Sequence, residues 1–305
     1  MSAPRIDSPV RRIGGHPFDF SRHIAVMAIV NRTPDSFYDR GATFTLDAAI
    51  DAGHGAISSG AEIVDIGGVK FAAGPAVPID DEIDRVIPVV RALAPRAVVS
   101  VDTFHADVAR AAIAAGASII NDTSGLRDPA MAEVIAESEA TVVIAHSLGT
   151  TPRTRFAPPQ YDDVVAEVAS YLRERVEFAV ARGIPRERII VDPGHDLHKN
   201  TLHSLELTAR LAELTGPDGL GLPLLVALSN KDFVGETLDR DIGERVAGSL
   251  SAAVYCAIQG ARIIRAHNVP EAVDAMRMVE AILGWREPAY LAHNMPPEEV
   301  TDAVA

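Results

Sequence analysis

The stretch Met27-Ala-Ile-Val-Asn-Arg-Thr-Pro-Asp-Ser-Phe-Tyr-Asp-Arg-Gly41 indicates the fold of this chain more clearly than any other. It continues an apolar run that begins at Ile24, has the length of a buried strand, and ends abruptly at Asn31 in a polar loop. Near-continuous runs of Val, Ile and Ala are typical of strands that are covered on both faces, as in parallel sheets. We therefore expect a parallel strand here whose carboxyl end leads into a polar loop.

Seven similar runs follow, and they alternate with amphipathic segments whose apolar residues recur every three or four positions, as in surface helices. The strands are expected at residues 24–30, 62–67, 97–102, 118–121, 141–146, 188–192, 224–229 and 262–266. Eight β/α units in a chain of 305 residues predict a TIM (βα)8 barrel. A doubly wound open sheet would usually carry a Gly-rich phosphate fingerprint after its first strand, and none follows Val30.

Composition limits the domain organisation and the partners. Residues 24–305 are expected to form a single domain, and residues 1–23 an N-terminal extension, rich in Pro, Ser and Gly, that is loosely ordered. The formal net charge of −14 argues against a nucleic-acid partner, because such binding depends on clusters of Lys and Arg. No apolar stretch suits a signal peptide or a membrane span, and the single cysteine, Cys256, can form no internal disulfide. We therefore expect a cytoplasmic protein with no membrane partner.

Almost every expected strand ends in a polar or ionisable residue. These residues are Asn31, Asp65, Asp102, Asn121, Asp122, His146, Asp192, Ser229, Lys231, Arg265 and His267. A single Asp or Asn in such a position commonly caps the helix that follows the strand. In a barrel, however, the carboxyl ends of all strands meet at one rim, and a purely structural rim does not need acids, amides, cations and histidines together. The pattern therefore predicts a binding or catalytic site at that rim.

Short motifs at these positions resemble those of the dihydropteroate synthases, a family of pterin-binding barrels. In chain order they are Asn31-Arg-Thr-Pro-Asp-Ser-Phe37, Asp65-Ile-Gly-Gly68, Ser100-Val-Asp-Thr103, Ile120-Asn-Asp-Thr-Ser-Gly125, Asp192-Pro-Gly194, Leu228-Ser-Asn-Lys231 and Arg265-Ala-His267. The resemblance implies a set of pterin-binding residues, namely Asp102, Asn121, Asp192, Lys231 and Arg265. It also implies that Asn31, Arg265 and His267 hold a diphosphate, with Mg²⁺ near Asn31. Lys231, Arg265 and His267 are then the expected catalytic residues.

These residue types suit the family's reaction, which joins 6-hydroxymethyl-7,8-dihydropterin diphosphate to p-aminobenzoate. A carboxylate such as Asp192 can accept two parallel hydrogen bonds from the donor edge of a pterin, and an Asn offers both a donor and an acceptor. Negative charge builds on the diphosphate as it leaves, and Arg265, His267 and Mg²⁺ would stabilise that charge. The resemblance also implies a homodimer formed through the last helices, which include an apolar helix expected at residues 239–261.

The chain departs from the family pattern in two loops. Where family members read Gly-Gly-Glu-Ser-Thr-Arg-Pro-Gly, residues 67–74 read Gly-Gly-Val-Lys-Phe-Ala-Ala-Gly, so Lys70, Phe71 and Ala72 alter the second-substrate loop. After Gly194 the family usually carries Phe-Gly-Phe-Gly, whereas residues 195–198 are His-Asp-Leu-His. Lys70 lacks the planar fork of the usual Arg. The chain thus resembles the second, non-synthase dihydropteroate synthase paralogue, and we expect it to bind a pterin with weak or lost condensation activity.

Other interpretations stay open. The chain could be a fully active synthase of folate biosynthesis, or a non-catalytic binder of pterin, p-aminobenzoate or sulfonamide-like ligands. A methyltetrahydrofolate–corrinoid methyltransferase-like role needs no diphosphate site, so the retention of Asn31, Arg265 and His267 argues against it. His195, His198 and His203 raise the alternative of a transition-metal site, but their spacing does not place a ligand pair on one helix face.

Overall fold

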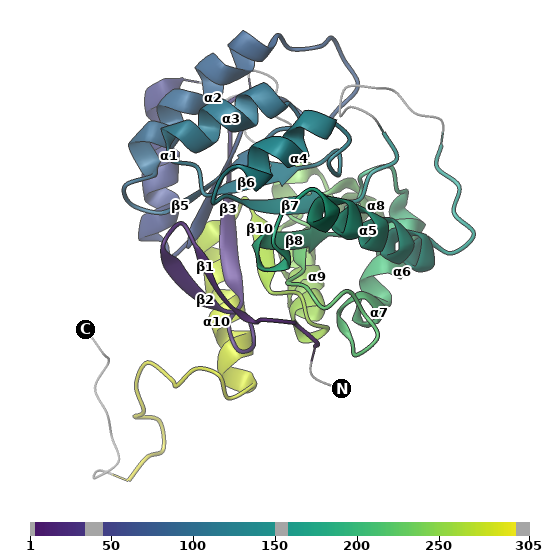
Figure 1. The fold of residues 1–305 in the computed structure, drawn as a ribbon. Helices are drawn as coiled ribbons and strands as arrows, with labels where there is room; N and C mark the ends of the chain where they lie inside the picture. The colour runs from purple at the N-terminus through teal and green to yellow at the C-terminus, as the bar shows by residue number, and fades with distance from the viewer. Residues whose placement is uncertain (1–3, 34–44, 150–157, 297–305) are drawn as a thin grey trace.

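The computed structural model describes residues 4–33, 45–149 and 158–296, and within them eight parallel strands form one sheet. The strands are β3 (Ala25–Asn31), β4 (Ile63–Gly67), β5 (Val98–Asp102), β6 (Ile119–Asp122), β7 (Thr141–Ala145), β8 (Ile189–Asp192), β9 (Leu225–Ala227) and β10 (Ile263–Ala266). Their order is β8-β7-β6-β5-β4-β3-β10-β9, so β3 lies beside β10 (Figure 1). A bridge between Val191 and Leu224 joins the two remaining edges. The expected TIM barrel and its eight strands are thus confirmed.

Helices follow the strands and cover the outside of the barrel (Figure 1). They are α1 (Leu46–Ser58), α2 (Ile79–Leu93), α3 (Ala106–Ala115), α4 (Pro129–Ala136), α5 (Val164–Ala181), α6 (Thr201–Ala209), α7 (Ala212–Thr215), α8 (Asp232–Leu238), α9 (Val246–Ile258) and α10 (Val269–Ile282). The helix expected at residues 239–261 is shorter than predicted, because Asp239 is the left-handed C-cap of α8 and a 3₁₀ turn, Ile242–Glu244, precedes the start of α9 at Val246. Two short 3₁₀ turns, Arg186–Arg188 and Ile242–Glu244, complete the helical elements of the described residues.

Apolar side chains pack on both sides of the sheet. One layer, between strands and helices, includes Val64, Val101 and Leu172, and a second cluster fills the inside of the barrel. Met27, Ile63 and other inward-facing residues of the second cluster are fully buried, as expected for a barrel whose interior is a packed core. Because this core fills the centre, the inside of the barrel has no room for a ligand.

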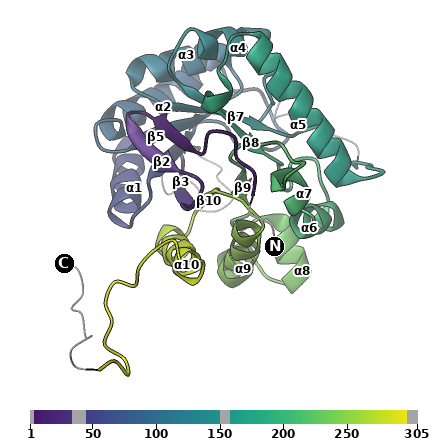
Figure 2. The same cartoon turned by 60° about the horizontal axis from the view of Figure 1, so that its bottom comes forward.

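The N-terminal extension contains a β-hairpin. Strands β1 (Val10–Ile13) and β2 (His16–Asp19) form an antiparallel hairpin, which lies across the amino-terminal end of the barrel (Figure 2). Phe18 and Phe20 are buried and stack with ring centroids 5.7 Å apart. Apolar side chains of this segment, among them Ile13, Phe18 and Phe20, close the bottom of the barrel core.

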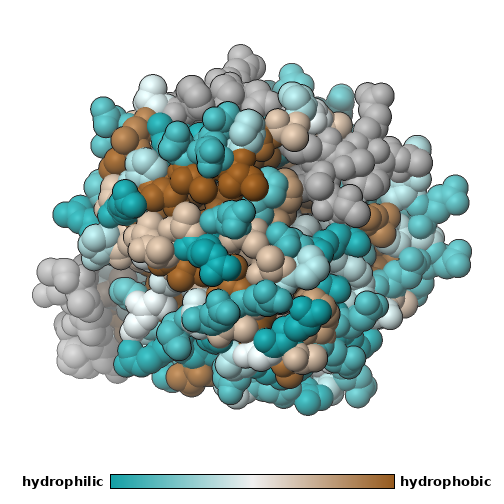
Figure 3. Space-filling model, turned by 45° about the horizontal axis from the view of Figure 1, so that its top comes forward, coloured by the Kyte–Doolittle hydropathy of each residue, from teal (hydrophilic) through white to brown (hydrophobic). Residues whose placement is uncertain are grey.

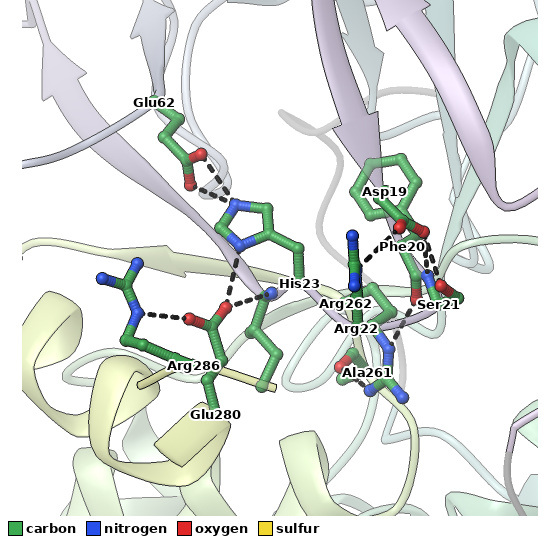
Figure 4. A network of polar contacts seen from close by, with 11 residues as sticks. Asp19, Phe20, Ser21, Arg22, His23, Glu62, Ala261, Arg262, Glu280 and Arg286 are labelled. Carbon is green, nitrogen blue, oxygen red and sulfur yellow. Dashed lines mark hydrogen bonds and ion pairs between the residues drawn. The ribbon is translucent and has the colours of Figure 1, made fainter. Parts of the chain in front are cut away.

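A polar network ties this end of the barrel together (Figure 4). The His23 ring bonds to Glu280 through Nδ1 (2.8 Å) and to Glu62 through Nε2 (2.7 Å). Glu280 also accepts hydrogen bonds from the Ile24 amide (2.8 Å) and from Arg286 (3.0 Å). Burial opposes the charged form of His23, but the bonds to the two glutamates outweigh it and raise its pKa to about 9. The network links the start of β3 to α10, near the far end of the chain.

On the face shown in Figure 3, polar side chains surround apolar patches. Exposed large apolar residues include Tyr255 and Ile258 on α9 and Met278 and Ile282 on α10. Within the described residues, every helix is too short or too polar to cross a membrane.

Candidate functional site

A cavity of about 450 Å³ lies at the carboxyl ends of the strands. Its lining comes from the segments that follow β3, β4, β5, β8, β9 and β10, and includes Asn31, Lys70, Phe71, Ala72, Asp102, Asp196, Leu197, Ser229, Asn230, Lys231, Asp232, Arg265 and His267. Eight of the residues that the sequence predicted for the site therefore line the same cavity. Residues 34–44, most of the opening loop, lie outside the described residues.

Arg265 is the centre of the charged network at the cavity floor. Its Nε donates to Asp65 Oδ2 at 2.6 Å and its Nη2 to Asp102 Oδ2 at 3.1 Å. Asn121 Nδ2 also donates to Asp65 Oδ2, at 3.2 Å. Burial, together with the nearby Asp65 and Glu82 carboxylates, raises the pKa of Asp102 although Arg265 and Lys231 oppose the shift. The carboxylates of Asp65 and Asp102 thus share the guanidinium of Arg265, and the floor of the cavity is rich in oxygen atoms that can accept hydrogen bonds.

Asp65 was not among the predicted binding residues, yet it anchors this floor. Its side chain is fully buried on β4, 0% exposed, and it holds both Arg265 and Asn121 in place. The strand-end pattern named Asp65, but its role depends on Arg265, 200 positions away in the sequence.

Asn121 and Asp192 lie behind the lining rather than on it. Asn121 is 2% exposed and Asp192 is 5% exposed. Asp192 Oδ1 accepts a hydrogen bond from the Gly194 amide at 2.7 Å. Burial raises the pKa of Asp192, and that bond, Lys231 and Arg265 act in the opposite direction. The structure therefore brings both residues to the site, at a deeper level than Asp102 and Lys231.

Asn31 and His267 lie at the ends of the neighbouring strands β3 and β10. A Cβ atom at Gly67 would come within 3.0 Å of Asn31 Oδ1, so the glycine leaves room for this amide. The His267 amide donates to Ser229 Oγ at 3.1 Å, and its Nδ1 lies 3.2 Å from the same hydroxyl. With Arg265 these groups form a side of the cavity that suits an anion.

The two loops that depart from the family pattern meet. Phe71, after β4, lies with its ring centroid 5.6 Å from that of His198, after β8. His198 Nδ1 also accepts from the Leu148 amide at 3.2 Å, and Tyr161 donates to the His198 carbonyl at 3.0 Å. The altered residues are therefore parts of one wall and not independent surface changes.

The three histidines of the segment 195–203 do not converge. His203 forms a capping box with Asn200 at the start of α6, while His195 is buried against Phe233. Within the described residues, no three His, Cys, Asp or Glu side chains are grouped closely enough to hold a metal ion.

A buried lysine next to these histidines was missed by the sequence analysis. Lys199 Nζ lies 2.8 Å from His146 Nδ1 and donates to the carbonyls of Gly194 (2.9 Å) and Leu197 (3.2 Å). Burial lowers its pKa to about 7, against the attraction of Asp192 and Asp196. Burial likewise lowers the pKa of His146 to about 2, so the ring accepts the lysine's hydrogen bond. Its bonds make Lys199 a brace of the loop that follows Asp192.

Comparison with known proteins gives consistent matches over most of the chain. Residues 27–267 match the family described as pterin binding enzyme. "Inactive dihydropteroate synthase 2" of Mycobacterium tuberculosis is 47% identical over 277 residues, covering 88% of this chain and 86% of that protein. The dihydropteroate synthase of Escherichia coli is 44% identical over 276 residues, covering 90% and 96%. A Yersinia pestis dihydropteroate synthase solved with a sulfonamide drug superposes with a TM-score of 0.84 at 39% identity, covering 91% of this chain and 100% of that one.

Proposed function

The chain belongs to the pterin binding enzyme family, and from that premise we propose that it binds 6-hydroxymethyl-7,8-dihydropterin diphosphate in the cavity at the carboxyl ends of the strands. The carrying observation is the convergence on one cavity of Asp102, Lys231 and Arg265, with Asn121 and Asp192 directly behind them. A ligand that reaches this depth meets acids, an amide and two cations together.

The pterin ring is proposed to lie against Asp192, Asn121, Asp102 and Lys231. The donor edge of a pterin pairs with a carboxylate, and an amide can serve the mixed edge beside it. Asn121 Oδ1 is buried and receives no hydrogen bond within the described residues. An unmet buried acceptor costs free energy, and a donor on the ligand would remove that cost.

The diphosphate is proposed to lie against Arg265, His267 and Asn31. The Asn31 side-chain oxygen lies against Gly67 at the wall of the cavity, and Mg²⁺ prefers oxygen ligands. Asn31 would hold the ion together with the phosphate oxygens, because a single amide is too few ligands by itself. When bound, the metal would neutralise part of the leaving group's charge.

Condensation with p-aminobenzoate is proposed to be weak or lost. In that reaction the aromatic amine attacks the hydroxymethyl carbon, the carbon–oxygen bond to the diphosphate breaks, and the amine loses a proton. The second substrate must approach along the wall formed by Lys70, Phe71 and Ala72. There Phe71 packs against His198, and no arginine stands at Ala72 to stabilise developing charge, a loss of order 10²–10³ in rate. p-Aminobenzoate or sulfonamide-like ligands would then bind the same wall without efficient turnover.

Two further properties belong to this proposal. The exposed apolar side chains of α9 and α10, such as Tyr255 and Met278, would form the interface of a homodimer. We place the protein in the cytoplasm, where the single thiol, buried Cys256, stays reduced.

A fully active synthase is the second candidate, and the 44% identity to the Escherichia coli enzyme favours it. The methyltransferase-like role has less support, since such an enzyme binds no diphosphate for Arg265 and His267 to hold.

Two measurements test the proposal. Calorimetry of the full chain with dihydropterin diphosphate and Mg²⁺ should show binding that Asp192→Ala abolishes, and equal binding by both proteins would refute the ring assignment. For the second step, the chain should fail to rescue a bacterial strain that lacks its own dihydropteroate synthase. Robust rescue would establish the fully active enzyme instead.

A further inference from the structure

Lys231 occupies a special place at the start of α8. It is the N-cap residue, its side chain makes no capping hydrogen bond, and it lines the cavity. The Lys231 ammonium acts electrostatically on the carboxylates of Asp102, Asp192 and Asp196, and its place among them depends on how the backbone holds the lysine. Helix starts leave backbone amides that need an acceptor from elsewhere.

Asp196 supplies that acceptor from the loop after β8. Its Oδ2 accepts from the amides of Asp232, at 2.7 Å, and Phe233, at 3.4 Å, the first two residues of α8. The other oxygen, Oδ1, accepts from the Ser204 hydroxyl at 3.1 Å, and the Asp196 amide donates back to Ser204 Oγ at 3.2 Å. Asp196 is thus held by α6 while it caps α8.

The backbone of Asp196 supports a specific role for its side chain. It has a φ of 61°, in the left-handed region that most residues other than glycine avoid. A non-glycine residue persists there only when its surroundings hold it in place. The contacts to Ser204, Asp232 and Phe233 are what hold it.

A second side chain, that of Arg245, holds the backbone of Lys231. Arg245 Nη1 donates to the carbonyls of Asn230, at 3.0 Å, and Lys231, at 3.2 Å. The peptide groups before and after Lys231 are therefore both fixed. A lysine needs such placement, because its ammonium is a point charge on a flexible stem and lacks the planar fork by which an arginine orients itself.

The distribution of lysines supports the same conclusion. The chain has 28 Lys and Arg residues, of which Lys70, Lys199 and Lys231 alone are lysines. Lys70 and Lys231 line the cavity, and Lys199 braces the loop that carries Asp196. The lysine side chains of this protein thus lie only at and beside the site.

We infer that Asp196 is a positioning residue, which caps α8 across the cavity mouth and thereby sets where the Lys231 ammonium meets a bound pterin. The identity of the ligand in this inference rests on the proposed function, whereas the capping of α8 by Asp196 does not. Removing the carboxylate would release the first turn of α8 and let Lys231 move. A displacement of about 1 Å in a positioned group can change its effect as much as a hundredfold.

The test uses the full chain labelled with ¹³C at lysine Cε, which gives three lysine signals that Lys70→Arg and Lys231→Arg assign. Asp196→Ala and Asp196→Asn both remove the charge that acts on Lys231, but Asn keeps an acceptor oxygen for the α8 amides. Without ligand, Asp196→Ala is therefore expected to shift and broaden the Lys231 signal more than Asp196→Asn does, and equal changes in the two variants would overturn the inference. In calorimetry with dihydropterin diphosphate and Mg²⁺, Asp196→Ala should bind about ten- to a hundredfold more weakly.

Asp128→Ala is the matched control, because Asp128 caps α4 through the Ala130 amide at 3.0 Å and also accepts from the Ala106 amide at 3.4 Å. It should lower the melting temperature to a similar degree without moving the Lys231 signal. An unmoved Lys231 signal in folded Asp196→Ala overturns the inference. If Asp196→Ala does not fold, Ser204→Ala takes its place, because it removes the hydroxyl that holds the Asp196 side chain. This variant must also move the Lys231 signal, and an unmoved signal overturns the inference. Failure of the wild-type chain to bind the pterin would count against the proposed function alone, since the labelled signals need no ligand.

Discussion

Replacing Asp65 by Asn tests the charged floor of the site most sharply, because the two side chains have the same shape and differ in charge. Asp65 is fully buried and accepts from Arg265 Nε at 2.6 Å and from Asn121 Nδ2 at 3.2 Å. Breaking a buried ion pair typically costs 3–5 kcal/mol, since it leaves a charge uncompensated. Asp102 remains as a second partner of Arg265 at 3.1 Å, so we expect the lower end of that range, about 3 kcal/mol.

The assay is urea denaturation of the wild type and Asp65→Asn, followed by calorimetry with dihydropterin diphosphate. For a chain of this size, about 3 kcal/mol corresponds to roughly 6–10 °C in melting temperature. Glu137→Gln is the control, since its pair with Arg110 spans 3.7 Å at the surface and should be worth less than about 1 kcal/mol. If Asp65→Asn destabilises no more than the control and binds pterin as well as the wild type, Asp65 does not anchor the floor.

Three other changes test separate parts of the account. The His23 pKa is raised to about 9. The stability that its charged form contributes is therefore complete below about pH 6.5, its ordinary pKa, and is lost as the pH rises through 9. Glu280→Gln removes one of its partners and should flatten this pH dependence of the melting temperature, and an unchanged profile would contradict the network. Gly67→Ala should push the Asn31 amide aside, because the added Cβ would lie 3.0 Å from Asn31 Oδ1. It should weaken binding of dihydropterin diphosphate about tenfold but leave binding of a pterin without the diphosphate unchanged. Equal losses of affinity for the two ligands would show that the effect is not confined to the diphosphate site. Phe71→Thr combined with Ala72→Arg should raise condensation turnover in a coupled assay, and no gain would shift the cause to the loop after β8.

The barrel could be predicted from the sequence because its signal is local. Each strand is a short run of buried apolar residues, and a polar residue such as Asn31 or Asp192 marks its end. Every predicted strand boundary lies within two residues of the observed one. The convergence of the strand ends at one rim follows from the barrel fold itself.

What the sequence could not provide depends on contacts between distant residues. The hairpin β1–β2 was missed because Arg11 interrupts its apolar pattern, yet Arg11 is 4% exposed and donates to the carbonyls of Glu187, at 2.9 Å, and Ile189, at 2.7 Å. The roles of Asp65 and Lys199 were missed for the same reason, since their partners Arg265 and His146 lie far away in the chain. A buried charge becomes meaningful only when its partner is known.

A crystal structure of the full chain grown with dihydropterin diphosphate and Mg²⁺ tests the central claim most directly. We predict the ring edge within hydrogen-bond distance of Asp192 and Asn121, and the diphosphate against Arg265, His267 and Asn31. Density for the ligand at another surface, or a ring that contacts neither Asp192 nor Asn121, would contradict the account.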